Sequence, residues 1–531
     1  MEDLASDAYK ALNRAWNSTC KILFGQEIGD LEDFAVWLSE YDEKIRTEKS
    51  FLSGKPVSFS QNDYADNAKF VAFDEVELNK FQPLSINEIK DIDSIIEAVV
   101  ERLCYTGNII LGNCSAVENS SNVTDSHVIL NSTVVSDSKY IGYTRHVRNS
   151  QYCFGLLGAE KDNYVIKSMG SELSRCFECH MVELLSDCYY CAKTQNCREC
   201  FFCFGTHGGA YMMGNTKLPK DKYLATKAKL LGEIADTLKS QKGIFSLLTV
   251  IEKASGHGVD KRLKYEKEEE TPFDISPIEE AFGKTSALLL GRELHGIEQY
   301  RDFLQKHVPK NVIAHSPLSG LPSVGSGYRA HILKKFPIER RMPTEKEMIW
   351  IGRNEKLANI IDIKMDENDL AEKFHPIAYT NLDKAAGNNS NFKNCPVIID
   401  CQDCLEGSAF IHSKKCAYCF WASSAEAVFG SCAAFNSLFC MKNFFCKNMA
   451  RSFECDGCNS CTNAYFLHNC ENVHDSMFCF NAKNLRRAVG NTALSSEQYD
   501  KIRSAIISQI AEELEQKKDL RWDIFNVGES R

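Results

Sequence analysis

Cysteine spacing is the feature of this sequence with the most obvious chemical potential. The chain has 24 cysteines among 531 residues, and many are spaced as CxxC, which is typical of zinc ligands. A structural zinc site needs four ligands around one ion, and iron–sulfur clusters also use cysteine thiolates. The candidate zinc or iron–sulfur ligands, in the two densest sets, are Cys197, Cys200, Cys203, Cys455, Cys458 and Cys461.

The same cysteines follow a period of three that favours packing over metal binding. Of the thirteen cysteines from Cys395 to Cys479, twelve fall on one count by threes, and Cys432 does not. A second count runs from Leu111 to Ser174, skips one residue, and resumes from Cys176 to Cys203. Serine, alanine and valine occupy the same steps elsewhere, and a buried thiol behaves as a small hydrophobe. We therefore expect core thiols and no cofactor.

A period of twelve is superimposed on the period of three. It is visible as CFEC at position 176, CYYC at 188 and CFFC at 200. A helix repeats every 3.6 residues and a flat strand every two, so a period of three indicates coils with frequent corners. A fixed period is the mark of a solenoid. The sequence predicts a narrow β-solenoid, and a left-handed hexapeptide helix is the alternative.

The whole arrangement occurs twice. ILFGQEIGDLEDFAVWL at position 22 matches LLLGRELHGIEQYRDFL at 288, and SFLSGKP at 50 matches SPLSGLP at 316, both at an offset of 266. GNTKLPKDKY at 214 matches GNTALSSEQY at 490, at an offset of 276. We predict an α+β repeat protein with two tandem solenoids, each with an N-terminal helical head and a C-terminal capping helix. A duplicated unit often replaces a homodimer, so the copies are expected to meet about an approximate two-fold axis.

The predicted segments are a helical head (1–104), a solenoid (105–215), a capping helix (216–243), a charged linker (244–277), a second head (278–390), a second solenoid (391–490) and a capping helix with a tail (491–531). Within the first head, residues 53–64 have the composition of a turn or loop. A helix follows in which Ser85 is the expected cap of an isoleucine-rich face.

Two aromatic rows should point outward, twelve residues apart along the coils. They consist of Phe177, Tyr189 and Phe201 in the first copy and Phe453, Tyr465 and Met477 in the second. Either the capping helix of each copy lies over its own row, or the rows form a protein–protein contact between the copies or with another chain, since large apolar patches usually mark interfaces.

The remaining features argue against several functional classes. A net charge of −10 gives no support to nucleic-acid binding, and the cluster Lys334, Lys335, Arg340 and Arg341 is expected on a solvated face. The histidines fall outside the inward positions and should face out. There is no P-loop, Gly-x-Ser-x-Gly or His-Glu-x-x-His motif, which disfavours an enzyme without excluding one. The start shows no secretory signal and no run is long enough to span a membrane, so we expect a cytoplasmic protein, or a particle assembled there.

The CxxC-rich coils, the FCF segment and the GN-x-x-L turn before a helix resemble cysteine-rich repeat proteins of unknown function from microbial genomes. The twelve-residue spacing is similar to that of insect antifreeze solenoids, which also carry an outward Thr-x-Thr row that this chain lacks. The resemblance implies the coil architecture and no activity.

These observations favour a non-enzymatic scaffold that docks to itself or to protein partners in a larger assembly, without nucleic acid or membrane. The alternatives are a metal-binding or redox protein that uses the CxxC ladders, and an enzyme with a site between the two copies.

Overall fold

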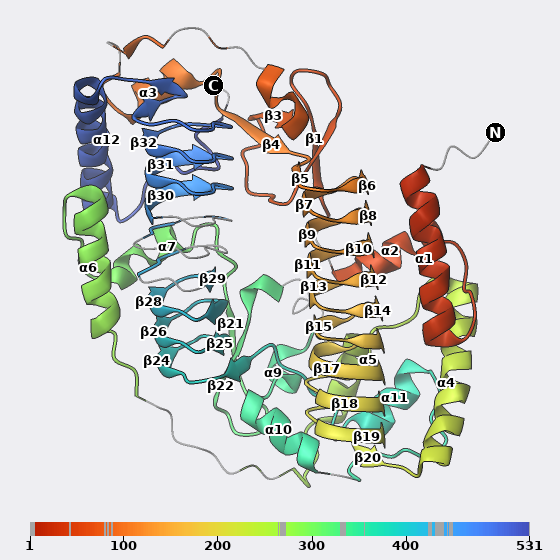
Figure 1. Cartoon of the computed structure of the whole chain (residues 1–531). Coiled ribbons are helices and arrows are strands. Elements are labelled where there is room, and N and C mark those ends of the chain that lie inside the picture. Colours follow the sequence, from red (N-terminus) through yellow and green to blue (C-terminus); the bar gives the residue numbers. More distant parts are fainter. Residues whose placement is uncertain are drawn as a thin grey trace.

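The protein is a mixed structure of helices and strands with a long, mainly parallel sheet, consistent with a solenoid-like repeat (Figure 1). The computed structural model describes residues 6–41, 44–78, 81, 84–86, 89–263, 265, 272–329, 336–354, 356–422, 427–430, 440–442, 444 and 450–529. Below, the first half is residues 6–263 and the second half is residues 272–529. No helix among these residues has the length and apolar character needed to cross a bilayer.

The first half begins with helices and two small sheets. Its helices are α1 (Asp7–Phe24), α2 (Ala35–Leu38), α3 (Ile92–Val99), α4 (Lys220–Gln241) and α5 (Leu247–Ala254). Its short strands before the long sheet are β1 (Arg46–Lys49), β2 (Pro56–Phe59), β3 (Lys69–Ala72) and β4 (Cys104–Gly107). The strands β1 and β2 pair as an antiparallel hairpin, and β3 pairs with β4 in parallel.

A 16-stranded sheet follows, here called the first stack. It comprises β5 (Ile110–Leu111), β6 (Ser115–Glu118), β7 (Ser121–Thr124), β8 (His127–Leu130), β9 (Thr133–Ser136), β10 (Lys139–Gly142), β11 (Arg145–Arg148), β12 (Gln151–Phe154), β13 (Leu157–Glu160), β14 (Asn163–Ile166), β15 (Met169–Ser171), β16 (Ser174–Phe177), β17 (His180–Tyr189), β18 (Gln195–Phe201), β19 (His207–Met213) and β20 (Thr216–Lys217).

The second half repeats this order of helices, short strands and stacked strands. Its helices are α6 (Ser276–Leu290), α7 (Arg301–Leu304), α9 (Ile338–Arg341), α10 (Glu345–Arg353), α11 (Glu367–Phe374) and α12 (Ser496–Lys517). A hairpin of β21 (Val312–His315) and β22 (Pro322–Gly325) precedes the second stack, which comprises β23 (Lys384–Ala386), β24 (Ser390–Lys393), β25 (Val397–Ile399), β26 (Gln402–Leu405), β27 (Ala409–Ile411), β28 (Lys414–Ala417), β29 (Phe420–Ala422), β30 (Ala450–Asp456), β31 (Thr462–His468), β32 (His474–Met477), β33 (Ala488–Val489) and β34 (Thr492–Ala493).

Most coils of both stacks advance by twelve residues, and the first step of each stack is thirteen. Ile141 pairs with Cys153 in the first stack, and Cys404 pairs with Cys416 in the second. The two stacks lie side by side and run in opposite directions, so that β30–β33 lie near the start of the first stack and β24 lies toward the end where the first stack finishes (Figure 1). The twelve-residue period predicted from the sequence is present among the described residues of both stacks.

The break in the count by threes is also present in the first stack, but it lies at a different position from the one predicted from the sequence. Val165 pairs with Cys176, eleven residues on, and the register shifts beside Gly170. The inner side chain there is Leu173, not the predicted Ser171 and Ser174. A Cβ at position 170 would overlap the carbonyl oxygen of Val182, so this tightened coil requires glycine.

The period of three has a backbone cause. The residue before most inner positions adopts a left-handed conformation, for example Glu178 (φ 51°), Tyr190 (φ 52°) and Phe202 (φ 54°), which precede Cys179, Cys191 and Cys203. Such a residue turns the chain and leaves one of every three side chains pointing inward. For an L-residue other than glycine this conformation costs about 1–2 kcal/mol, so each corner must be stabilised by its surroundings.

The inner side chains supply part of that stabilisation. The hydroxyl of Ser132 donates to the carbonyl oxygen of Leu130 (2.8 Å) and accepts from the N–H of Thr144 in the next coil (3.2 Å). The thiol of Cys188 donates to the carbonyl oxygen of Ser186, also two residues back (3.3 Å). Serine and cysteine therefore interchange at inner positions because both are small and both satisfy the carbonyl group of a corner.

The recurring Gly-Asn pair ends each stack. The side-chain amide of Asn215 donates to the carbonyl oxygen of Phe204 (2.8 Å) and its oxygen accepts from the Phe204 N–H (2.8 Å). Asn491 makes the same two bonds with Phe480 (2.7 and 3.0 Å). In both cases one amide replaces the backbone of a further coil, and an antiparallel turn and a long helix follow.

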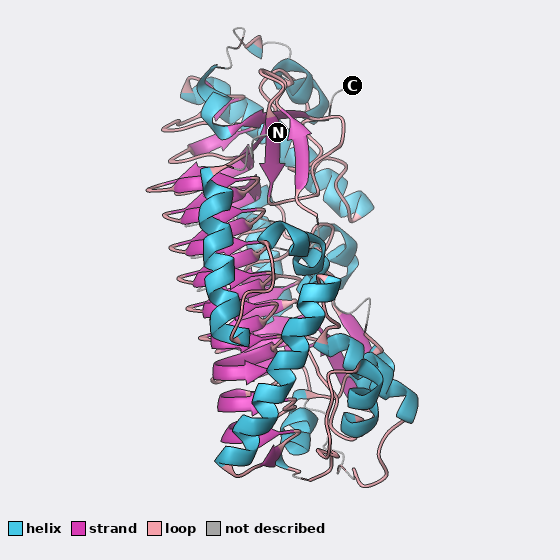
Figure 2. Cartoon of the chain, turned by 90° about the vertical axis from the view of Figure 1, so that its right-hand side faces the viewer, coloured by secondary structure: helices cyan, strands magenta, loops and turns pink. Residues whose placement is uncertain are grey.

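Helices cover the outer apolar sides of the stacks. Helix α1 runs along strands β6 to β16 and meets α4, which continues along the same side (Figure 2). Helix α6 lies against β26, β28 and β30 and meets α12 in the second half. The interior of each stack forms its own apolar cluster, and two larger clusters lie between the stacks and these helices.

Two local predictions in the first half were wrong. Helix α3 begins at Ile92 and not at Ser85, because Asp91 and Ser94 form a reciprocal capping box at its start. The predicted loop at 53–64 contains strand β2, whose Val57 and Phe59 are buried in the core. Tertiary burial of these side chains outweighs the turn-forming residues on either side.

The prediction that the basic cluster lies on a solvated face was also partly wrong. Arg340 is exposed as expected, but Arg341 is completely buried. Its guanidinium donates to the carbonyl oxygens of His375 (2.7 Å), Gly258 (3.1 Å) and Ala254. Lys334 and Lys335 lie outside the described residues.

The role of the terminal asparagine can be tested by replacing it with glycine, which tolerates the left-handed backbone at that position (φ 61°). We expect Asn215→Gly to lower the free energy of unfolding by about 2 kcal/mol, since the buried N–H and C=O of Phe204 lose their partner. The control is Asn196→Gly at an exposed corner with φ 52°. Equal losses for the two variants in denaturant titrations would contradict the assigned role.

Candidate functional site

The six candidate metal ligands lie inside the stacks. Each of these cysteines exposes at most 3 % of its surface to solvent. Their thiols contact backbone carbonyl oxygens, as for Cys203 with Phe201 (3.7 Å) and Cys458 with Asp456 (3.3 Å). Among the residues that the structure describes, no group of three or more histidine, cysteine, aspartate or glutamate side chains could hold a metal ion.

Burial raises the pKa of the Cys395 and Cys416 thiols to about 12, so both are protonated at neutral pH. Among the six candidate ligands, hydrogen bonds from neighbouring thiols lower the pKa of Cys200 and Cys461, and the pKa of the other four is raised. The thiolate is the reactive form, and an apolar setting without a neighbouring cation disfavours it. No disulfide joins the described cysteines, and all of them except Cys114 are buried.

We expect the buried cysteines of both stacks to resist iodoacetamide in the native protein and to react once the chain is unfolded in guanidinium, as measured by mass spectrometry of the alkylated peptides. Elemental analysis of protein purified without oxygen should find no stoichiometric zinc or iron. Rapid native labelling of Cys200 or Cys458, or a bound metal, would contradict a packing role.

The six residues of the aromatic rows are buried against the chain's own helical segments. In the first half, Phe177 lies edge-on to Phe24 (5.1 Å between ring centres), and the Tyr189 hydroxyl donates to the carbonyl oxygen of Leu23 (3.0 Å). In the second half, Tyr465 donates in the same way to Leu289 (2.8 Å). The other three, Phe201, Phe453 and Met477, have no exposed surface.

A buried ion pair accompanies each row. Lys167 lies 3.6 Å from Glu178, and its ammonium group is 4.9 Å from the centre of the Trp37 ring. In the second half Lys442 lies 2.9 Å from Glu454. Burial raises the pKa of Glu454, and the lysine counteracts that rise. A lysine and a carboxylate removed from water need such partners, so these groups hold the coil to the segments around it.

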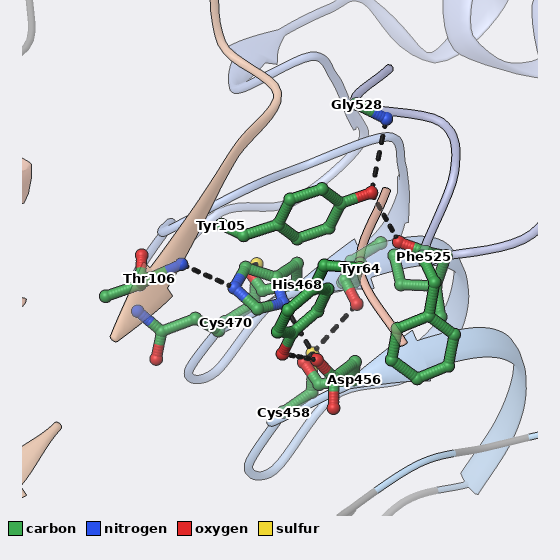
Figure 3. Close-up of polar contacts among 12 residues, drawn as sticks. Tyr64, Tyr105, Thr106, Asp456, Cys458, His468, Cys470, Phe525 and Gly528 are labelled. Atoms are coloured by element: carbon green, nitrogen blue, oxygen red, sulfur yellow. Dashed lines mark hydrogen bonds and ion pairs between the residues drawn. The ribbon is translucent and has the colours of Figure 1, made fainter. Parts of the chain in front are cut away.

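The most elaborate polar cluster lies where the first half meets the second stack (Figure 3). Asp456 and His468 occupy equivalent places in adjacent coils, twelve residues apart. The Asp456 carboxylate accepts hydrogen bonds from the Tyr64 hydroxyl (2.7 Å) and from Nδ1 of His468 (3.0 Å). The backbone N–H of Thr106 donates to Nε2 of the same imidazole (3.0 Å).

This hydrogen-bonding pattern determines what the imidazole can do. Because Nε2 accepts from a backbone N–H, it carries no proton, and Nδ1 carries the proton that Asp456 accepts. A His–Asp pair resembles the base of many hydrolases, but here the nitrogen that would take a proton from a substrate is already occupied. The arrangement is therefore suited to holding two segments together rather than to acid–base catalysis.

Aromatic rings seal the cluster from solvent. Tyr105 stacks on Tyr64 (4.4 Å between ring centres) and meets the His468 ring edge-on (5.2 Å). Its hydroxyl donates to the carbonyl oxygen of Ile524 (2.9 Å) and accepts from the N–H of Gly528 (3.2 Å) (Figure 3). Burial raises the pKa of Tyr64 and Tyr105 far above the usual tyrosine value, so both stay neutral donors.

A cavity of about 30 Å³ adjoins the cluster, with walls from both halves of the chain. Its lining includes Ser60 and Asn122 from the first half and Asp456 and Asn469 from the second. This volume and its polar walls suit one or two water molecules, and are far below the several hundred Å³ that enclose a small organic ligand.

A second charged cluster also joins the two halves. Nδ1 of His307 lies 3.2 Å from Asp63 of the first half, and Nε2 lies 3.0 Å from Asp523. Burial lowers the pKa of His307, but the hydrogen bonds to Asp523 and Asp63 outweigh it, and the net effect is a raised pKa. The two carboxylates thus favour an imidazolium in the folded protein.

Reciprocal contacts occur at the end of the first stack, where the second half supplies the covering segments. Helix α10 lies so close that a Cβ at Gly205 would overlap the carbonyl oxygen of Met348. Phe374 of α11 stacks on Phe202 (4.9 Å), and Lys384 pairs with Glu183 (2.7 Å).

The sequence indicated part of this site. The prediction that the histidines face away from the inner positions fits His468 and His180, but both are buried under other segments. The twelve-residue spacing between Asp456 and His468 was available as a clue, since it places the two side chains on one side of adjacent coils. Tyr64 and Thr106 lie about 350 or more residues away in the sequence, and nothing in the spacing predicted their contact.

No known protein family, curated protein or solved structure matches this chain.

Removing the central carboxylate should destabilise the fold. Asp456→Ala leaves the Tyr64 hydroxyl and the His468 N–H buried without an acceptor, and we expect a loss of about 3 kcal/mol in the free energy of unfolding. Tyr64→Phe removes one donor and should cost about 1 kcal/mol. Urea titrations measure both, and an Asp456→Ala variant as stable as the wild type would disprove the role of this cluster.

The His307 cluster predicts a pH dependence. A raised folded pKa means that the stabilisation is complete below the unfolded value of about 6.5 and is lost as the pH rises through the folded pKa. Between about pH 6 and about pH 9, the melting temperature of the wild type should therefore fall more than that of His307→Gln. Parallel curves for the two proteins would show that the imidazole does not titrate differently on unfolding.

Proposed function

We propose that the protein is a non-enzymatic scaffold built from two tandem narrow β-solenoids that form one rigid frame about an approximate two-fold axis. Each copy has a helical head and a capping helix. The frame acts as a component of a larger assembly through protein–protein contacts, without a metal cofactor, nucleic acid or membrane.

The observation that carries this proposal is the exchange of segments between the halves. Described segments of the first half between residues 64 and 106 lie on the end of the second stack, where Arg102 donates to Thr492 (2.6 Å) and the Ile92 N–H donates to Gln509 (2.9 Å). Residues 341–384 of the second half lie on the end of the first stack, where Arg341 and Lys384 contact Gly258 and Glu183. Such an exchange makes each half part of the core of the other, which favours stiffness over a hinge between domains.

Matching contacts in the two copies support the two-fold arrangement. The Leu247 N–H donates to Glu178 (3.1 Å), and the Ile524 N–H donates to Glu454 (3.0 Å). The hydroxyl of Ser50 donates to Glu75 (2.6 Å), and that of Ser316 donates to Glu347 (2.5 Å). These pairs are separated by 266 to 277 residues, as expected for one unit used twice.

The association of the two halves can be tested by inserting a site-specific protease sequence within residues 264–271 and cutting the purified full chain. We expect the two fragments to remain together in size-exclusion chromatography and native mass spectrometry and to separate only in denaturant. The same cut in a chain carrying Arg102→Ala and Arg341→Ala should release the fragments at a lower denaturant concentration, because two buried arginines that bridge the halves are lost. Separation of the wild-type fragments in native buffer would contradict the proposal.

The assembly role has its own test. A tagged full-length chain purified from the cells that produce it should carry stoichiometric protein partners or further copies of itself in native mass spectrometry. Recovery as a metal-loaded monomer, or as a monomer with catalytic turnover on a bound substrate, would favour one of the alternative functions.

A further inference from the structure

The His468 cluster contains a buried carboxylate that no positively charged side chain neutralises (Figure 3). Asp456 is 3 % exposed, and both of its hydrogen bonds, from Tyr64 and from Nδ1 of His468, end on the same oxygen, Oδ2. The imidazole is neutral because its Nε2 accepts from the N–H of Thr106 (3.0 Å). Among the described residues, no lysine or arginine forms an ion pair with Asp456. A carboxylate removed from water is costly unless a cation or further hydrogen bonds compensate for it.

The cavity beside this carboxylate is lined by acceptor atoms that have no donor. Asp456 Oδ1 accepts no hydrogen bond within the described part of the chain, and the same is true of the side-chain oxygens of Asn122 and Asn469. The amide nitrogens of those two asparagines donate elsewhere, to Ser60 (2.6 Å) and to Asn481 (2.8 Å). All three acceptors belong to residues that line the cavity of about 30 Å³, and no lysine or arginine lines it. These walls favour a ligand with a positive charge.

Arg145 is a positive group near this wall, but it does not replace such a ligand. Its guanidinium donates to the backbone carbonyl oxygen of Ser60 (2.6 Å), and it makes no ion pair with the Asp456 carboxylate. Arg145 is also absent from the lining of the cavity. The charge of Asp456 is therefore left to whatever the cavity holds.

The first copy places its own cation at the equivalent corner. Asn469 in the second stack corresponds to Lys193 in the first, 276 residues earlier, and both have a left-handed backbone (φ 50° and 52°). The buried Lys193 ammonium lies 3.4 Å from Glu345 of the second half and donates to the carbonyl oxygen of Asp383. The covering segments correspond as well, since Asp383 and Thr106 are 277 residues apart. One junction thus contains an ammonium group where the other has a shorter asparagine and a cavity.

We propose that this cavity binds a monovalent cation of about the size of potassium or ammonium, through Asp456 Oδ1 and the side-chain oxygens of Asn122 and Asn469. A single carboxylate matches a single positive charge, whereas calcium takes about six to eight oxygen ligands and magnesium demands a near-ideal octahedron. A potassium ion is close to a water molecule in size, so the cavity has room for the ion and one water molecule. Gly457 in the wall is exposed, which gives the ion a route from solvent.

The ligands of this site come from both halves of the chain. Asn122 belongs to β7 of the first stack, and Asp456 and Asn469 belong to adjacent coils of the second. The bound ion therefore ties the two stacks together at one junction, as Lys193 does at the other. Its role is to neutralise a charge in a structural joint, which differs from the zinc or iron–sulfur chemistry considered for the cysteines. The site concerns one chain and does not depend on a larger assembly.

The test is thermal unfolding of the intact chain by calorimetry at one pH and one ionic strength, in the chloride salts of potassium, sodium, ammonium and choline. We expect at least one of the three small cations to raise the melting temperature by about 2 °C or more above that in choline, which is too large for the cavity. The rise should grow with the logarithm of the cation concentration. Asp456→Asn should abolish the difference, because a neutral amide needs no counter-charge.

Asn469→Lys is the decisive variant, because it gives the second stack the ammonium group that Lys193 supplies to the first. We expect it to fold and to melt at the same temperature in all four salts. The matched control is Asn472→Lys, at a left-handed corner outside the cavity whose amide likewise donates to an asparagine of the next coil, Asn484 (2.6 Å). This control should keep the cation dependence of the wild type.

Three results would overturn the inference. The first is a wild-type chain that melts at the same temperature in all four salts. The second is an Asn469→Lys variant that keeps the full dependence, which would place the ion elsewhere. The third is stabilisation by millimolar calcium or magnesium chloride with none by the monovalent cations.

Discussion

The structure depends on a backbone that turns at every third residue around a very narrow interior. Left-handed residues at the corners are unfavourable for most side chains, and the inner positions hold mainly serine, cysteine, alanine, valine, isoleucine and leucine. The coils persist because the inner hydroxyls and thiols bond to corner carbonyl groups and because every coil pairs with the next. Phe410 is an instructive exception, since it fits inside only where Gly407 leaves space beside its ring.

This constraint explains why groups with chemical potential have structural roles here. A thiol that bonds to a carbonyl oxygen in a closed interior is shielded from solvent, so CxxC spacing does not imply a metal site. The buried lysines Lys167 and Lys442 pair with carboxylates of their own half. Asp456 and His468 instead bond to Tyr64 and Thr106, which are distant in sequence, and these bonds join the two halves.

The exchange of segments between the halves makes each half part of the core of the other, but the two copies are not identical. The two copies share the contacts of Glu178 and Glu454, yet the His468 cluster has no equivalent at Ala192, the matching position in the first stack. The rims differ as well, with lysines at the start of the second stack and none at the start of the first.

The sequence by itself determined the repeat: the period of three, the period of twelve, the inner residues from Cys395 to Ala488 that the structure describes, and the internal likeness of the two halves. These features are local, because every coil has the same inner positions and corners. The residue types that fit those positions therefore recur at a fixed spacing in the sequence. Only the tertiary structure decided that Arg341 is buried and that Tyr64 and Thr106 meet Asp456 and His468. The second set of contacts joins segments hundreds of residues apart, and its geometry depends on how whole stacks lie against each other, so no local spacing in the sequence could predict it.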